Sequence, residues 1–105
     1  MPKMSKAARG KHRWIGLVFD ETFLEINSLR KTIQNLIQKP HIKLFDYINE
    51  DKRKSCIIKI ELGAYGVAKE KLRKKDSNIF SITSSGKIRL VRLRLEEYFQ
   101  RQVDD

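Results

Sequence analysis

The feature that most constrains the fold is a change in the spacing of apolar residues near residue 20. Residues 13–19 ("RWIGLVF") form an almost continuous apolar run, as in a strand buried inside a sheet. In residues 20–39 the apolar side chains instead follow one face of a helix, at Ile26, Leu29, Ile33, Leu36 and Ile37. Asp20 and Glu21 suit the first turn of this helix, and Pro40 ends it.

The middle of the chain predicts two strands joined by a charged connection. Residues 41–48 ("HIKLFDYI") form the first strand, and residues 49–54 ("NEDKRK") are the connection. In residues 55–62 ("SCIIKIEL") one face is apolar and the other carries Lys59 and Glu61, which is the alternation of a strand. Cys56 lies on the apolar face, so we expect a small core residue; a reactive thiol is the alternative.

A weaker helix over 63–75 and a short strand over 78–83 follow. The resulting order is strand, helix, strand, strand, helix, strand, which is the split β-α-β pattern of ferredoxin-like and RNA-recognition domains. It predicts an α+β sandwich with a four-stranded antiparallel sheet and two helices on one face. We expect one domain over residues 13–101, preceded by a flexible basic arm (1–12) and followed by an acidic tail (102–105).

The last segment, residues 86–101, can be interpreted as a strand or as a helix. A strand would need a bulge, because Ile88 and Leu90 share one face while Val91, Leu93 and Leu95 share the other. On a helical wheel, Ile88, Val91, Leu95, Tyr98 and Phe99 form one stripe. We therefore predict an additional C-terminal helix, capped by Ser84 or Ser85, that covers a sheet edge or part of the second face. Leu90 and Leu93 lie on its far side and are not explained by this packing.

Charge indicates the class of partner. The 105 residues carry a formal net charge of +10, and such self-repulsion is usually retained for a polyanion. Nucleic acid is the first candidate and an anionic membrane surface the second; the scattered basic residues do not favour the membrane. A single cysteine, no signal peptide and no membrane-length apolar run predict a soluble cytoplasmic protein.

The sequence lacks the usual signs of an enzyme. It contains no nucleophile motif, phosphate-binding loop or dinucleotide fingerprint, and its two histidines and one cysteine have no zinc-ligand spacing. We expect a domain that is not catalytic alone and binds no cofactor.

The basic residues gather at the ends of the predicted elements, which suits recognition of phosphates and shape in folded RNA. The strand 55–62 has no aromatic residue for base stacking. The Ser-Ser-Gly junction at 84–86 leads into a helix whose free N–H groups favour an anion. Lys87 and Arg89 stand at this helix end, where cations are normally disfavoured. A phosphate there would reverse that preference.

Three segments also resemble a known family: "KHRWIGLVF" (11–19), "DYINEDKRKSCIIKIEL" (46–62) and "FSITSSGKIRLVRLRLEEYF" (80–99). Together they are similar to protein component 2 of archaeal ribonuclease P, called Pop-five in eukaryotes, over residues 11–100. The Ser-Gly junction and closing helix are the most characteristic part.

The resemblance implies an RNA-binding subunit that assists a catalytic RNA in removing the 5′ leader of precursor tRNA. The expected partners are ribonuclease P RNA, precursor tRNA and protein component 3, with which the family tends to form a heterotetramer. Magnesium is expected on the RNA and not on the protein. The resemblance and the charge pattern together predict RNA contacts at Lys11, Arg13, Lys52, Arg53, Lys54, Lys87, Arg89 and Arg92.

Two other functions stay open at this point. A ribosomal or other RNA-scaffold protein could have the same charge and fold. A protein-binding adaptor without an RNA role would instead use Leu90, Leu93 and an open sheet edge.

Overall fold

The computed structural model describes residues 12–39, 42–74 and 77–104. Within these ranges the elements are β1 (His12–Phe19), α2 (Ile26–Ile37), β2 (Leu44–Glu50), β3 (Arg53–Glu61), α3 (Leu62–Lys71), β4 (Ile79–Ser85) and α4 (Ile88–Asp104). Their order agrees with the sequence prediction. His12, which the sequence assigned to the arm, is the first residue of β1.

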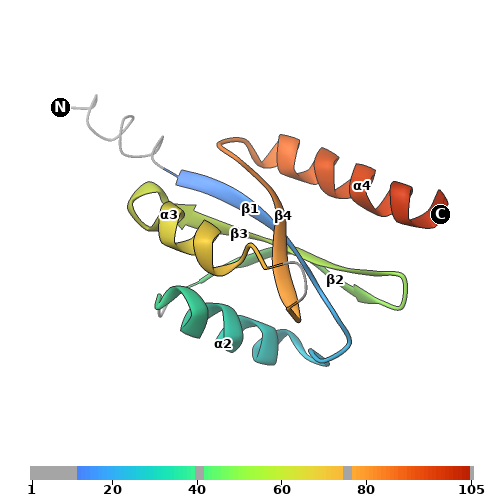
Figure 1. Cartoon of the computed structure of the whole chain (residues 1–105), viewed down its shortest axis with the longest axis horizontal. Coiled ribbons are helices and arrows are strands. Elements are labelled where there is room, and N and C mark those ends of the chain that lie inside the picture. The colour runs from blue at the N-terminus through green and yellow to red at the C-terminus, as the bar shows by residue number, and fades with distance from the viewer. Residues whose placement is uncertain (1–11, 40–41, 75–76, 105) are drawn as a thin grey trace.

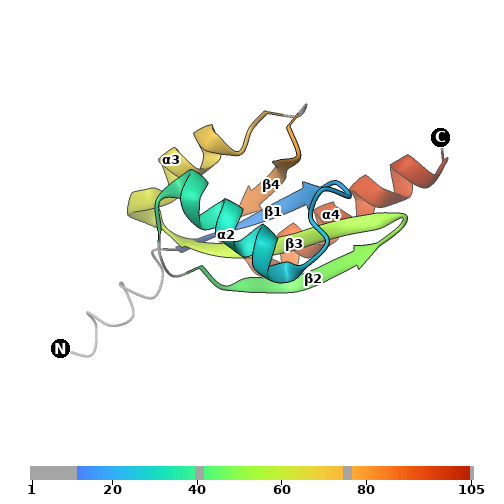
Figure 2. The same cartoon turned by 90° about the horizontal axis from the view of Figure 1, so that it is seen from below.

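The strands form one antiparallel sheet in the order β2-β3-β1-β4 (Figure 1). Helices α2 and α3 cover one face of this sheet, and α4 lies across the other face (Figure 2). The predicted α+β class with an added C-terminal helix is therefore confirmed. The position of α4 is now defined, because it covers the second face and does not extend an edge.

Alternation along β1 and β3 supplies two cores. On the α2–α3 side, alternate residues of β1 and β3 pack with one face of α2. These residues are Ile15, Leu17 and Phe19 of β1, Cys56, Ile58 and Ile60 of β3, and Leu29, Ile33 and Ile37 of α2. On the α4 side, Val18 and Ile57 pack with Val91 and Leu95. A strand covered on both faces needs apolar residues at successive positions. This double covering explains why residues 15–19 are apolar without alternation.

The first helix begins later than predicted, at Ile26 instead of residue 20. Asp20 forms a local turn, because its Oδ1 accepts the N–H of Thr22 at 2.9 Å and its carbonyl accepts the N–H of Phe23 at 3.3 Å. This turn places the Phe23 ring in the core, 6.2 Å from the ring of Phe19. An aspartate that bonds the backbone two residues ahead favours a turn over a helix.

The charged segment 49–54 is also shorter as a connection than predicted. Strand β2 continues to Glu50, which pairs with Arg53, so only Asp51 and Lys52 form the turn. The cross-strand pairs Glu50–Arg53 and Asn49–Lys54 extend the ladder at the hairpin end, beyond Ser55, the last residue of β3 that pairs with β1. The start of β2 at Leu44 is later than the predicted residue 41, and residues 40–41 lie outside the described ranges.

Helix α4 is a helix throughout, from Ile88 to Asp104, and so runs into the predicted acidic tail. The predicted stripe of Ile88, Val91, Leu95, Tyr98 and Phe99 packs on the sheet. The side chains of Leu90 and Leu93 face away, with exposed fractions of 37% and 54%. Strand β4 ends at Ser85 and not at residue 83, and α3 ends at Lys71 instead of residue 75.

Candidate nucleic-acid interface

Two parts of the chain that are distant in sequence, the start of β1 and the end of β4, lie side by side in the sheet. Strand β1 pairs with β4 so that Trp14 lies opposite Ser85 and Ile15 opposite Ser84. Residues 1–19 contain five lysines and arginines and no aspartate or glutamate, and residues 77–95 contain four and also no acid. The rest of the chain holds 14 basic and 13 acidic residues. The two segments therefore account for nine of the ten net charges. Of the first segment the structure describes residues 12–19, which include Arg13, and β1–β4 pairing brings these residues beside residues 79–85.

The junction between β4 and α4 is stabilised by short-range hydrogen bonds. Ser85 Oγ accepts the N–H of Lys87 at 3.1 Å, and the Lys87 carbonyl accepts the N–H of Leu90 at 3.1 Å. Of the two serines predicted as caps, Ser85 therefore makes the bond at the helix start. The N–H groups of Lys87, Leu90 and Val91 are thus paired, whereas those of Ile88 and Arg89 have no acceptor within the helix. The exposed side chain of Lys87 extends from this point.

Three further cations surround the same junction. Arg94 Nη1 donates to Thr83 Oγ1 at 3.3 Å and to the Ser84 carbonyl at 3.2 Å. Arg13 Nη1 lies 3.6 Å from the position that a Cβ on Gly86 would occupy. Lys69 Nζ lies 5.4 Å from the centre of the Tyr65 ring, and Tyr65 connects Lys69 to the junction.

Tyr65 links helix α3 to the end of β4. Its hydroxyl is 2.6 Å from Ser84 Oγ, and the Arg13 guanidinium lies 5.9 Å from the centre of its ring. We call the surface formed by Arg13, Lys69, Lys87 and Arg94 the junction surface. No described acidic side chain makes a hydrogen bond or ion pair with these four residues.

Sequence reasoning missed Lys69, Arg94 and Tyr65. Arg94 could have been found, because it follows Lys87 by seven residues and two helical turns place both on one side. Lys69 and Tyr65 join the site only through the packing of α3 beside β4, for which the sequence carries no local signal.

Two of the predicted RNA contacts, Arg53 and Arg92, form ion pairs that hold α4 against the sheet. Arg92 Nε donates to Asp46 Oδ2 at 2.7 Å and Arg92 Nη2 to Asp46 Oδ1 at 3.3 Å. This carboxylate raises the pKa of Arg92 above its ordinary value, first through the hydrogen bond and then through charge. Arg53 Nη1 donates to Glu96 Oε2 at 2.6 Å, and its guanidinium covers the Phe99 ring at 4.9 Å.

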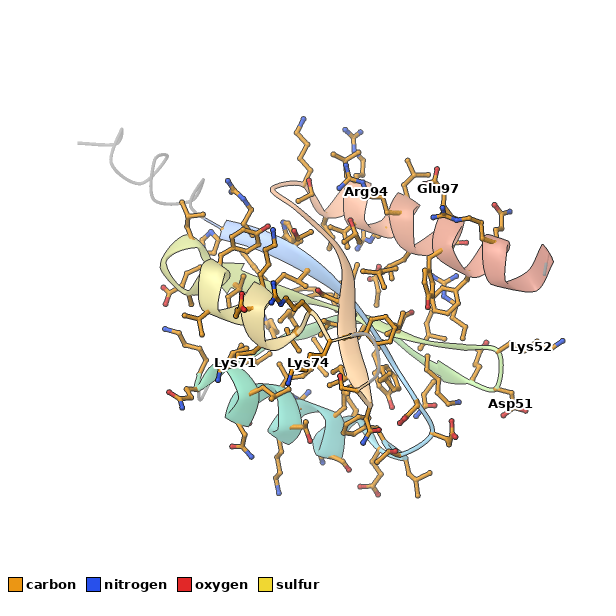
Figure 3. All side chains as sticks on the ribbon, in the orientation of Figure 1. Asp51, Lys52, Lys71, Lys74, Arg94 and Glu97 are labelled. Atoms are coloured by element: carbon orange, nitrogen blue, oxygen red, sulfur yellow. The ribbon has the colours of Figure 1, made fainter. Side chains whose placement is uncertain are left out.

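The remaining predicted contacts are spread over the molecule. Lys52 lies at the exposed tip of the β2–β3 hairpin, away from the β4–α4 junction (Figure 3). Lys54 Nζ donates to the Glu50 carbonyl at 2.8 Å. Arg89 is exposed, three residues before Arg92 and so on the same side of α4. Lys11 lies outside the described residues.

The histidine, cysteine and acidic side chains of the described residues are spread over the fold. No group of three or more histidine, cysteine, aspartate or glutamate side chains gathers among them. Cys56 is fully buried, and burial raises the pKa of its thiol to about 12, so the thiol stays neutral and acts as a core residue. None of the described helices is long and apolar enough to cross a membrane.

Comparison with known proteins adds no identification, because no protein-family model and no curated protein matches this sequence.

Proposed function

We propose that this protein binds folded RNA through the junction surface. The observation that carries the proposal is the gathering of four basic side chains around the β4–α4 junction, with which no described acidic side chain pairs. Lysine and arginine side chains without acidic partners are what a phosphate backbone attracts, with release of its counterions. Lys87 and the free N–H groups at the start of α4 also favour the binding of an anion at this helix end.

Recognition in this proposal depends on phosphates and shape, not on base stacking over the sheet. Helix α4 occupies the face opposite α2 and α3, where an open sheet could hold bases. Trp14 on that face is packed edge-on against Phe45, with ring centres 5.1 Å apart, and Lys59 covers it at 5.4 Å. The rings of Trp14 and Phe45 therefore belong to the core between the sheet and α4.

The more specific form of the proposal is a subunit of ribonuclease P. Its support is the resemblance of residues 11–100 to protein component 2, together with a sheet, a Ser-Gly junction and a closing helix in the expected order. In this proposal the protein assists the catalytic RNA, which carries the magnesium, and associates with protein component 3. The contacts at Lys11, Lys52, Lys54 and Arg89 remain part of it.

A salt-dependence measurement tests RNA binding by the junction surface. Lys87→Gln with Arg94→Gln removes two charges there, while Lys71→Gln with Lys74→Gln removes two exposed charges near the end of α3 (Figure 3). If each junction cation contacts a phosphate, the slope of log Kd against log salt should fall by about 1.5–2 in the first variant. The control should keep the wild-type slope. Equal slopes in both variants would remove these residues from the interface.

Recovery of RNA from cells tests the identity of the partner. The C-terminally tagged chain is purified from its native cell and the bound RNA is sequenced, with ribonuclease P RNA as the expected product. Recovery of ribosomal RNA would replace the specific proposal with a ribosomal role. Absence of any RNA would favour an adaptor that uses the exposed Leu90 and Leu93.

A further inference from the structure

A cleft between β2 and α4 lies on the other side of α4 from Lys87 and Arg94. It has a volume of about 320 Å³, and its polar lining comes from Asp46, Arg53, Ser55, Arg92 and Glu96. Leu95 supplies apolar wall. Strand β2 has a bulge here: its register with β3 shifts between Phe45 and Ile48, and Asp46 has a φ of 51°. The bulge places Asp46 at the rim of the cleft.

Two buried donors in this cleft have no acceptor. Within the part of the chain that the structure describes, the buried side-chain polar atoms without a hydrogen-bond partner are Ser55 Oγ and Arg53 Nε. Both residues line the same cleft, and Ser55 is only 1% exposed. A buried polar atom left unpaired costs free energy, so two that converge in one cleft indicate a missing partner. Since Arg53 Nε–H can only donate, that partner must supply acceptor oxygens.

The donors of the cleft, and not a net charge, favour an anion as this partner, because its two arginines are matched by two carboxylates. Arg53 and Arg92 approach it from β3 and α4, and each is held by a carboxylate that is well exposed at its outer side. The side chain of Asp46 is 37% exposed and that of Glu96 is 62% exposed, so either can turn toward solvent. Arg89 adds an exposed positive charge on the same side of α4.

We propose that the β2–α4 cleft binds a tetrahedral oxyanion of the phosphate type. Ser55 Oγ and Arg53 Nε donate to its oxygens at the floor of the cleft. The Arg92 guanidinium, which keeps Nη1 free of the pair with Asp46, donates from the side of α4. This site goes beyond the proposed RNA surface and uses none of its four residues.

The decisive test is an NMR titration of the full chain that follows the backbone amide of Ser55 and the Nε–Hε signals of Arg53 and Arg92. Sodium phosphate is added at constant ionic strength, with sodium chloride as the reference. We expect saturable shifts of these three signals with phosphate only. A parallel titration with a short RNA distinguishes free phosphate from a phosphodiester, since the same signals should move with whichever source fits the cleft. If neither phosphate nor RNA moves them, the proposal is wrong.

Ser55→Ala separates ligand binding from packing. Removing an unpaired buried hydroxyl should leave the protein as stable as wild type or more stable, while the Kd for the oxyanion rises about tenfold. Arg92→Gln should weaken binding similarly, whereas Arg101→Gln, an exposed change on the same helix, should not. An unchanged Kd in both Ser55→Ala and Arg92→Gln would overturn the site. A smaller RNA salt slope in the Lys87→Gln, Arg94→Gln variant tests the junction surface and not this cleft.

Discussion

Gly16 determines how closely helix α4 can approach the sheet. A Cβ at this position would lie 2.9 Å from Thr83 Cγ2, 3.0 Å from Val91 Cγ1 and 3.3 Å from Leu95 Cδ1. Real Cβ atoms essentially never approach as closely as the first of these. The absence of a side chain in the middle of β1 is therefore what lets Val91 and Leu95 pack directly on the strand.

We expect Gly16→Ala to destabilise the fold by about 0.5–2 kcal/mol, as the overpacking cost exceeds the gain in strand propensity. Urea denaturation followed by circular dichroism measures this. Gly66→Ala is the matched control, because no atom lies within 4 Å of its added Cβ; in a helix it should stabilise by about 0.5–1 kcal/mol. A neutral Gly16→Ala would contradict the close packing of α4 on β1.

At this scale the sequence predicts the identity of core residues better than their partners. The buried position of Cys56 followed from alternation alone. The role of Gly16 did not, because a glycine in an apolar run can mark many kinds of close approach. Arg53 and Arg92 were predicted as RNA contacts from charge, and their pairing with Glu96 and Asp46 depends on distant segments that only the folded chain brings together.

The element that changes the fold most is α4, since without it one face of the sheet would be open. Its apolar stripe was predictable because a 3.6-residue period fitted residues 88–99 without the bulge that a strand requires. The sequence does not decide whether this helix covers a sheet edge or the second face. The choice depends on Val18, Ile57 and Gly16, which come from strands that the helix sequence does not contain.

The two sides of α4 should respond differently to the same substitution. Leu95 is 2% exposed and packs in the second core, so Leu95→Ala should cost about 2–5 kcal/mol. Leu93 is 54% exposed, and Leu93→Ala should change stability by less than about 0.5 kcal/mol. Thermal and urea unfolding of both variants measure the difference. Comparable losses would mean that Leu93 is covered in solution.

For the whole molecule, the important property is that the net charge is concentrated and not spread. The order of the elements could be predicted from the sequence, and Lys87 was identified from its unfavourable position at a helix start. The convergence of residues 12–19 with residues 79–85 could not be predicted from either segment, since it depends on which strands are neighbours. The four-stranded order β2-β3-β1-β4 provides this neighbour relation.

We expect this concentration to make stability depend on salt. Raising sodium chloride from about 20 to 200 mM shortens the Debye length to less than 10 Å and should raise the Tm by a few degrees, because repulsion at the junction surface is screened. Differential scanning calorimetry measures the shift. The Lys87→Gln, Arg94→Gln variant should show a smaller shift than the Lys71→Gln, Lys74→Gln variant. A Tm that falls with salt would mean that favourable ion pairs outweigh this repulsion.

The antiparallel pairing of β1 with β4 also has a practical consequence for anyone who handles the protein. A fusion ahead of residue 12 joins the chain where β1 starts, beside Ser85 and the proposed RNA surface. Helix α4 begins at that surface and runs away from it for 17 residues, about 25 Å, to Asp104 (Figure 1). Affinity tags, dyes and surface-immobilisation groups therefore belong at the C-terminal end, where they leave the junction accessible.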